Sequence, residues 1–255
     1  MFGILATADP ANALEWMVFL AQKYASMFWQ GTWVTLYVAV LGTIIGFLLG
    51  YVIGIIQDIQ INQEDNIIKK ILAKILKVTS VVYVEIFRDT HMMVQAMIIY
   101  FGLRQSDIEI GAVTAGILVT VLNTGAYMAE TVRAGIKSID PGQKEGALAL
   151  GMSPLLAMFT VVLPQAFKNI IPEMANTFLT NLKMTSVLNV IGVSELFMTA
   201  KTVGGNYYKY FESYLIIAVI YFVFCFAFNR IFLWIEKKMS MKSDYVLAVE
   251  YMDNQ

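Results

Sequence analysis

Polar side chains recur at helical spacing inside two otherwise apolar stretches of this 255-residue sequence. In the first stretch, Asn123, Tyr127 and Glu130 occupy positions i, i+4 and i+7. The second stretch repeats that spacing with Asn176, Thr180 and Lys183. Residues spaced in this way share one face of an α-helix, so each set presents its polar groups together.

These side chains could bind a solute that carries both charges. Lys183, with the hydroxyls of Thr185 and Ser186 just after it, could bind a carboxylate. Glu130 or Asn123 could bind an ammonium group. The pattern therefore indicates solute recognition by hydrogen bonds and charge.

A third polar cluster comprises Thr90, His91 and Gln95. Asp89 and Thr90 can hydrogen-bond nearby backbone groups in place of a helical ladder, which predicts a break in the helix at this point. The sequence therefore offers three polar positions whose placement depends on the surrounding elements.

The composition shows whether those elements lie in water or in a membrane. Hydrophobic residues make up 58% of the chain and charged residues 15%, and the mean hydropathy is +0.65. A soluble domain of this length is far less apolar. We therefore expect an all-α, polytopic membrane protein, and the scattered basic residues give no indication of nucleic-acid binding.

Runs of about 20 apolar residues are long enough to cross a bilayer. Five such runs are present, and polar residues interrupt the middle three. The predicted transmembrane helices cover residues 31–56, 79–103, 110–136, 170–196 and 214–235.

The first of these runs has glycines at four-residue spacing, which predicts a groove where another helix packs closely. They are Gly42, Gly46, Gly50 and Gly54. Residues 13–29 and 67–78 instead have the amphipathic character of helices that lie at a lipid surface. We assign residues 1–30 to an extracytoplasmic amphipathic segment, 31–237 to the transmembrane domain and 238–255 to a cytoplasmic tail.

The distribution of basic residues predicts the orientation in the membrane. Loops 57–77, 133–169 and 230–255 each contain four lysines or arginines, whereas the opposite side contains four in total. We therefore expect the N-terminus outside and the C-terminus inside the cell.

On this topology His91, Asn123 and Lys183 fall near the bilayer midplane, where transporters tend to bind solutes. Each residue also has a structural alternative. Lys183 could reach a lipid headgroup or pair with a carboxylate, and Glu130 could pair with Arg133 at i+3. His91, the single histidine, could be a packing residue with a hydrogen bond rather than a proton-coupling group.

The cytoplasmic loop 138–168 has its own pattern. Asp140-Pro141 and Ser153-Pro154 each predict a helix start, since Asp and Ser cap helices and proline suits the first turn. Leu163-Pro164 is expected to interrupt the second helix. The pattern predicts two short helices joined at a corner whose small residues admit a partner.

This loop resembles the cytoplasmic signature of the membrane subunits of ATP-binding-cassette (ABC) importers, in the polar amino acid branch. The family pattern is Glu-Ala-Ala, three residues, Gly, nine residues, then Ile-x-Leu-Pro. The matching positions here are Glu145, Gly146, Ala147, Gly151, Val161, Leu163 and Pro164. The resemblance extends over about residues 30–235, through stretches such as NTGAYMAETVRAGIKSIDPGQKEGALALGMS.

The resemblance implies a type I importer fold in the cell membrane, with the loop acting as a coupling helix against a separate ATPase. The coupling residues would be Glu145, Gly146, Ala147, Gly151, Met152, Ser153 and Pro164. It also implies a second permease subunit, identical or paralogous, and an extracytoplasmic amino-acid-binding protein. ATP and Mg would be bound by the partner ATPase, and this chain would have no cofactor or metal of its own.

The chain departs from the family at two positions that bear on the substrate. Relatives usually have Arg-Gly-Thr-Pro where this chain has Arg88-Asp89-Thr90-His91, and Leu-Lys-Asp-Thr-Ser where it has Met184 in place of the acid. The missing acid favours a neutral or acidic amino acid over a cationic one.

The chain is not expected to be an enzyme, because Met152 stands where a phosphate-binding loop requires lysine. Its single cysteine, Cys225, excludes a disulfide or a thiolate metal site within one chain. Two other functions remain open: a gradient-driven secondary amino acid carrier with Glu130, His91 and Lys183 as a proton relay, and a structural scaffold. The absence of internal repeats counts against the carrier.

Overall fold

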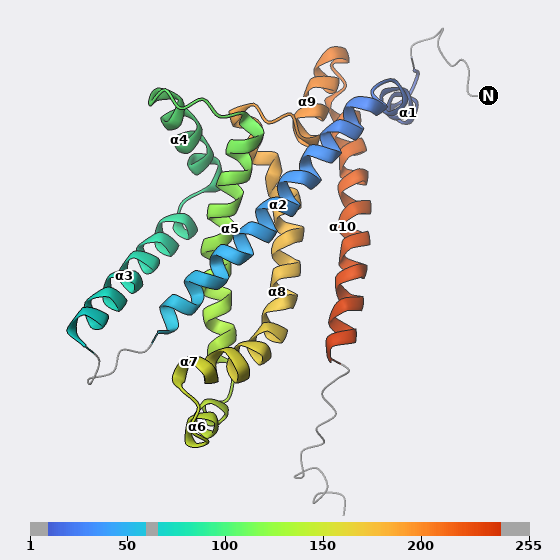
Figure 1. Ribbon diagram of the computed structural model, residues 1–255. Coiled ribbons are helices and arrows are strands. Elements are labelled where there is room, and N and C mark those ends of the chain that lie inside the picture. Colours follow the sequence, from blue (N-terminus) through green and yellow to red (C-terminus); the bar gives the residue numbers. More distant parts are fainter. Residues whose placement is uncertain (1–9, 60–65, 241–255) are drawn as a thin grey trace, which may run out of the picture.

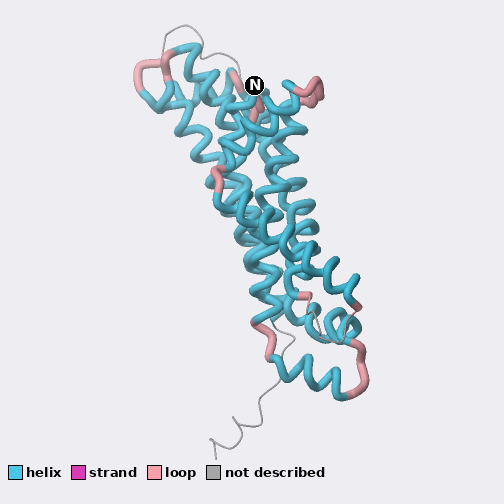
Figure 2. Tube along the Cα trace, turned by 90° about the vertical axis from the view of Figure 1, so that its left-hand side faces the viewer, coloured by secondary structure: helices cyan, strands magenta, loops and turns pink. Residues whose placement is uncertain are grey.

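The computed structural model describes residues 10–59 and 66–240, and all regular elements in these ranges are helical. The predicted all-α class is confirmed. Parts of the predicted N-terminal segment, of the link after residue 57 and of the C-terminal tail lie outside the described residues. Helices α1 and α9 lie at one end of the molecule and α6 and α7 at the other, and the long helices run between them (Figures 1 and 2).

Within the described residues, four helical stretches are long and apolar enough to cross a membrane: Ala25–Asp58, Ala112–Lys137, Pro154–Ile191 and Tyr210–Met239. They correspond to four of the five predicted spans. Helix α2 is Ala25–Asp58, α5 is Ala112–Lys137, α8 is Leu163–Met184 and α10 is Tyr210–Ser240.

The second predicted span, 79–103, is not one helix. Helix α3 (Ile67–Asp89) ends where Thr90 becomes extended, and α4 (Met92–Gln105) begins after an extended His91. The Thr90 hydroxyl donates to the Ile86 carbonyl at 2.5 Å and satisfies the end of α3. The predicted break is therefore confirmed, and the amphipathic stretch 67–78 is the first half of α3.

The glycine groove of α2 packs against α5, as predicted. A Cβ atom added at Gly42, Gly46, Gly50 or Gly54 would lie only 2.3–2.7 Å from the nearest α5 side-chain atom. The α5 partners also repeat every four residues and are Thr120, Thr124, Met128 and Val132. Both series ascend together, so the two helices run parallel with their backbones close.

The fourth predicted span, 170–196, ends earlier than expected. The α-helix stops at Met184 and tightens into a 3-10 helix, Thr185–Ile191, which Gly192 ends at a φ of 87°. Because the left-handed region suits glycine and not most other residues, the chain leaves the helix here. Glu195 then caps α9 (Leu196–Tyr207) instead of continuing the span.

The predicted amphipathic helix 13–29 is divided at Tyr24. Helix α1 (Ala13–Lys23) ends there because Tyr24 is not helical, and residues from Ala25 onward belong to α2. Lys23 and Tyr207 form a hydrogen bond that joins α1 to α9 and raises the pKa of the Lys23 ammonium. Helix α1 is thus packed against the end of α9.

The loop 138–168 contains the two predicted short helices, α6 (Pro141–Ala149) and α7 (Pro154–Ala157). Asp140 and Ser153 accept hydrogen bonds from the first turns, as expected of cap residues. Leu163-Pro164 does not interrupt the second helix. A π-helical turn, Met158–Val162, instead connects α7 to α8 without a gap, since Pro164 lacks the N–H that an α-ladder needs there.

Candidate functional site

Helix α8 exposes polar side chains along most of its length. Between Ile170 and Lys183 every exposed residue is polar, whereas the buried positions are apolar except for one asparagine. With one further position at the start, the exposed set repeats with the spacing of one helix face and is here named the α8 polar stripe: Asn169, Glu173, Asn176, Thr180 and Lys183. Fourteen residues of helix place its ends about 21 Å apart.

Helix α10 has the opposite character. Its exposed residues include Phe222, Val223, Phe226 and Ile231, each at least half exposed or close to it. Such a surface suits contact with acyl chains, whereas a charged residue such as Lys183 within the hydrocarbon core is costly to leave against lipid. The two helices lie side by side (Figure 1). An apolar face that suits lipid therefore lies next to a polar face that needs water or protein against it.

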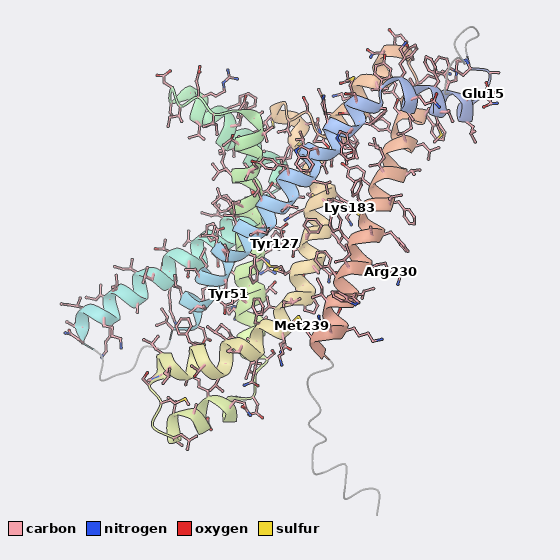
Figure 3. All side chains as sticks on the ribbon, turned by 45° about the vertical axis from the view of Figure 1, so that its right-hand side comes forward. Glu15, Tyr51, Tyr127, Lys183, Arg230 and Met239 are labelled. Atoms are coloured by element: carbon pink, nitrogen blue, oxygen red, sulfur yellow. The ribbon has the colours of Figure 1, made fainter. Side chains whose placement is uncertain are left out.

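Lys183 lies on the α8 polar stripe beside α10 (Figure 3). Its ammonium is close enough to act electrostatically on the Cys225 thiol of α10. Among the described residues it has no hydrogen bond or ion pair, so its donors are available to a ligand.

Thr185 and Ser186, predicted to share a carboxylate with Lys183, are placed differently from it. Thr185 is fully buried and its hydroxyl donates to the Leu182 carbonyl at 3.0 Å. Ser186 is half-buried, and its carbonyl accepts from the Asn189 side chain. The three residues lie within four positions of the chain, but residues two or three positions apart at the change from α-helix to 3-10 helix do not share one direction here.

The break between α3 and α4 gathers a second polar group. The Gln95 amide nitrogen lies within 2.8–3.0 Å of the Phe87 carbonyl and of both oxygens of Thr90. From α5, the Asn123 amide donates to the same Phe87 carbonyl at 3.0 Å and to the Gln95 side-chain oxygen at 3.2 Å. Three of the predicted site residues thus satisfy the backbone groups that the break leaves without helical partners.

Tyr127 and His91 complete this second group. The Tyr127 hydroxyl donates to the Arg88 carbonyl at 3.3 Å, one turn of α5 beyond Asn123. Nδ1 of His91 accepts from the Met93 amide at 3.2 Å and caps α4. This hydrogen bond is the one expected if His91 has a structural role rather than a proton-coupling role.

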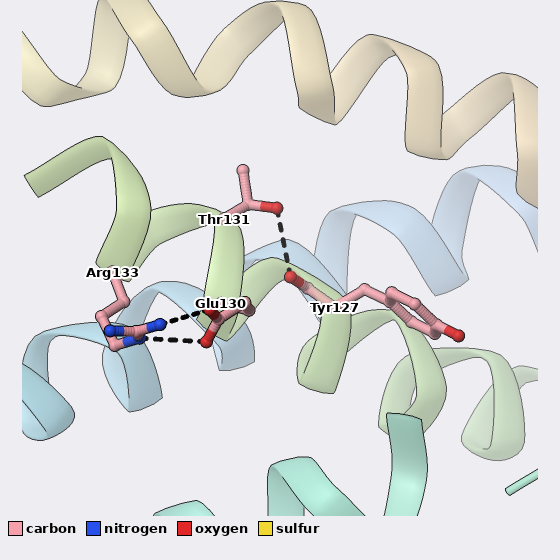
Figure 4. Close-up of polar contacts among 4 residues, drawn as sticks. All are labelled: Tyr127, Glu130, Thr131 and Arg133. Atoms are coloured by element: carbon pink, nitrogen blue, oxygen red, sulfur yellow. Dashed lines mark hydrogen bonds and ion pairs between the residues drawn. The ribbon is translucent and has the colours of Figure 1, made fainter. Parts of the chain in front are cut away.

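Glu130 forms a two-pronged ion pair with Arg133 on the same helix (Figure 4). The Nε–Oε2 distance is 3.0 Å. The predicted structural pairing is confirmed. No hydrogen bond among the described residues joins this pair or the group at the break to Lys183, so the predicted site residues fall into three separate hydrogen-bonding groups.

Some polar residues were not predicted. Asn181, which is 6% exposed, donates at 2.9 Å to the hydroxyls of both Thr43 and Thr124, and so connects α8 to α2 and α5. Glu173 also belongs to the α8 polar stripe. The sequence signal for it was available, because Glu173 stands three residues before Asn176 in the pattern that already contains Thr180 and Lys183.

The corner between α6 and α7 exposes apolar side chains at the end of the molecule. They are Leu148, Leu150, Leu155, Leu156 and Phe159, and Leu150 is 83% exposed. Gly146 faces open space, since a Cβ atom added to it would have nothing within 4 Å, and Gly151 turns the corner at a φ of 85°.

The other residues predicted for coupling surround this corner: Glu145, Ala147, Met152, Ser153 and Pro164. Ala147 is buried under the corner, while Glu145, Ser153 and Pro164 are exposed. Within the described part of the chain, no group of three or more His, Cys, Asp or Glu residues could hold a metal ion.

A bundle of membrane-crossing helices with a polar face along one of them, and an exposed corner at one end, defines a polytopic permease of the cell membrane. The chain belongs to the family of binding-protein-dependent transport system inner membrane components, whose model matches residues 70–241.

Named relatives agree with this assignment. The chain is 38% identical over 169 residues to a probable amino-acid permease protein, YxeN, of Bacillus subtilis (strain 168), covering 65% of this chain and 75% of that one. It is 39% identical to the arginine transport system permease protein ArtQ of the same strain, covering 62% and 72%. It is 37% identical to a putative glutamine transport system permease protein, GlnP, of Rickettsia typhi, covering 65% and 76%.

Solved structures show the same fold. A crystal structure of an amino acid ABC transporter with histidines matches with a TM-score of 0.77 and 37% identity, covering 90% of this chain and 100% of that one. An inward-facing MetNI methionine ABC transporter matches with a TM-score of 0.70 at 19% identity, covering 85% and 98%. These findings support an ABC permease rather than a gradient-driven carrier.

Proposed function

We propose that this chain is the membrane-spanning subunit of an ATP-driven importer for a polar amino acid, and that the amino acid passes along the α8 polar stripe. The substrate class is supported by relatives named as amino acid, arginine and glutamine permeases. The observation that carries the pathway is the α8 polar stripe in a molecule whose neighbouring helix exposes apolar side chains.

A polar face at membrane depth needs water or protein against it, because acyl chains offer no hydrogen bonds. A second permease subunit, identical or paralogous, supplies both when the two α8 stripes face each other across an aqueous path. Lys183 then binds the carboxylate of the solute, Thr180 lies about one turn away for its other polar groups, and Asn176 and Glu173 lie about two and three turns away along the path.

The groups around the α3–α4 break have a supporting role in this proposal. Helices α3 and α4 together make the second of the five predicted crossings of the membrane. Gln95, Asn123 and Tyr127 hold the break between them against α5. These side chains are engaged with backbone carbonyls, so they bind solute only if those bonds are exchanged during transport. The predicted roles of Thr90, His91 and Glu130 are proposed to be structural in the same sense.

Coupling to ATP is proposed to occur through loop 138–168. The exposed leucines and the open surface at Gly146 provide an apolar docking patch of the kind that marks protein interfaces. A cytoplasmic ATPase dimer binds ATP and Mg, grips this corner and shifts the helices, because its closed state contacts the corner differently from its open state. This chain itself performs no catalysis.

The orientation follows from the same arrangement. The corner must be in the cytoplasm for an ATPase to reach it, which puts the α1–α9 end outside, where an amino-acid-binding protein delivers solute. The predicted distribution of basic residues agrees with this orientation.

The substrate is tested by a thermal-shift screen of the binding protein against each of the twenty amino acids, followed by ATP-dependent uptake of any hit into vesicles that contain the full assembly. We expect Lys183→Met to reduce uptake about tenfold or more, as loss of a charged hydrogen bond would. Lys201→Met, an exposed lysine at the α9 end, is the matched control and should leave uptake unchanged. Equal uptake by both variants would remove Lys183 from the pathway.

The pathway itself is tested by accessibility. In a Cys225→Ser background, Asn176→Cys and Thr180→Cys should react with a membrane-impermeant maleimide, and solute should slow the reaction. Phe222→Cys, on the lipid-compatible face of α10, should not react. Protection of all three positions from the reagent would contradict an aqueous path along α8.

A further inference from the structure

The first half of α3 is an amphipathic helix whose apolar face is uncovered. Between residues 67 and 78 the apolar side chains are 40–71% exposed. They are Ile67, Ile68, Ile71, Leu72, Ile75, Leu76 and Val78. A monomer rarely leaves so continuous an apolar surface without a partner or a membrane against it.

The opposite face of the same segment is basic. Lys70, Lys74 and Lys77 follow one another at i, i+4 and i+7, and Lys69 lies at the edge between the two faces. Lysines at the flank of an apolar face can extend their stems along it and place their ammonium groups outside it.

The place of this segment in the molecule indicates that its partner is a membrane. The start of α3 projects from the bundle, towards the end that carries α6 and α7 (Figure 1). Exposed apolar residues continue along α3 to Val82 and Ile86, which are 46% and 53% exposed where α3 passes the bundle, with the exposed Thr79 and Glu85 among them. A surface that is lipid-facing along the span, and gains lysines only at its outer end, fits a bilayer from acyl chains to headgroups.

We propose that residues 67–78 bind anionic phospholipids in the leaflet on the α6–α7 side. The apolar face lies among the acyl chains, and the four lysines bind the phosphate and other anionic headgroup oxygens. Each basic residue near an anionic membrane surface is worth about 1 kcal/mol, or about fivefold in binding. The segment thereby fixes the depth of the start of α3 in the leaflet.

The test uses the full chain in nanodiscs, with its four native tryptophans replaced by phenylalanine, one introduced tryptophan as the reporter and brominated lipids as quenchers. Ile75→Trp, on the apolar face, reports lipids beside α3, and Phe222→Trp reports those beside α10. We expect brominated phosphatidylglycerol to quench the Ile75→Trp reporter at several-fold lower mole fraction than brominated phosphatidylcholine. The Phe222→Trp reporter should show no preference.

Replacing the four lysines by glutamine should abolish the preference at the Ile75→Trp reporter, while replacing all four by arginine should keep it. If the glutamine variant fails to insert, salt provides a second measurement, because the preference should fall between about 0.1 and 1 M salt as charges are screened. Added inorganic phosphate should compete no better than chloride of equal ionic strength.

Equal quenching by the two lipids in the unaltered lysine background would overturn the proposal. An absence of quenching by either lipid in the assembly with its ATPase would also overturn the proposal, since the surface would then be covered by protein. The experiment does not depend on the transported solute, so it can fail while the proposed transport function holds.

Discussion

Gly50 of α2 lies so close to Met128 of α5 that a Cβ atom on the glycine would stand 2.5 Å from the methionine Cβ and 2.7 Å from the Gly125 carbonyl oxygen. No side chain fits at that distance. The same relationship repeats at four successive glycines, so the contact between the two parallel helices is made by backbone against side-chain stems. In a membrane, where no hydrophobic force favours helix association, such close packing is a principal source of stability.

Gly50→Ala should therefore destabilise the bundle, by about 1–3 kcal/mol as for other overpacked positions. Thermal unfolding of the purified chain in detergent measures the change. Gly102→Ala is the matched control, because Gly102 of α4 has nothing within 4 Å of its added methyl group. Equal melting temperatures for both variants would show that α2 and α5 are not in close contact in solution.

Asn181→Leu should also destabilise the bundle, since it removes both hydrogen bonds that connect α8 to Thr43 and Thr124 and leaves the hydroxyls buried. Interhelical hydrogen bonds in membranes are worth about 0.6 kcal/mol each on average. A double-mutant cycle with Thr43→Val measures the coupling, with Asn229→Leu on the exposed face of α10 as the control. Additive effects of Asn181→Leu and Thr43→Val would mean that the two side chains do not interact.

Gly146→Leu and Gly151→Val separate docking from folding at the α6–α7 corner. Gly146 is helical and unobstructed, so leucine should leave the chain stable yet block ATPase binding, measured by co-purification. Gly151→Val should destabilise the corner itself by about 1 kcal/mol or more, because a β-branched residue is strained at a positive φ. Normal ATPase binding by Gly146→Leu would place the docking surface elsewhere.

Glu195→Gln tests the buried carboxylate that caps α9. Glu195 is fully buried, accepts from the Phe197 and Met198 amides at 2.7 Å each, and accepts from the Tyr221 hydroxyl at 3.4 Å. An amide cannot accept with both ends, so we expect a loss of about 1–3 kcal/mol in unfolding free energy. The exposed Glu109→Gln should have no effect in the same chemical denaturation experiment.

Much of the bundle could be predicted because membrane spans and helix caps depend on local composition. The glycine groove, the caps at Asp140 and Ser153 and the break at Thr90 are all properties of a few neighbouring residues. The helix end at Met184 was harder to place. It depends on Gly192 and on Glu195 turning back to cap the next helix, and apolar residues continue well past it.

The candidate site was predicted less completely for a similar reason. Helical spacing indicated that Asn176, Thr180 and Lys183 share a face, but it did not reveal that this face is exposed. It also could not show that Asn123 and Gln95 are engaged with the Phe87 carbonyl, since the Asn123 contact joins residues 36 positions apart. Which polar groups remain available is a property of the packed helices.

The polar face of α8 also bears on how the cell maintains the amount of this protein. A copy inserted alone would expose the polar face of α8 to hydrocarbon, which is costly. Because cells degrade proteins that do not reach a stable fold, we expect the steady-state level of the chain to follow the supply of the proposed second permease subunit rather than its own rate of synthesis.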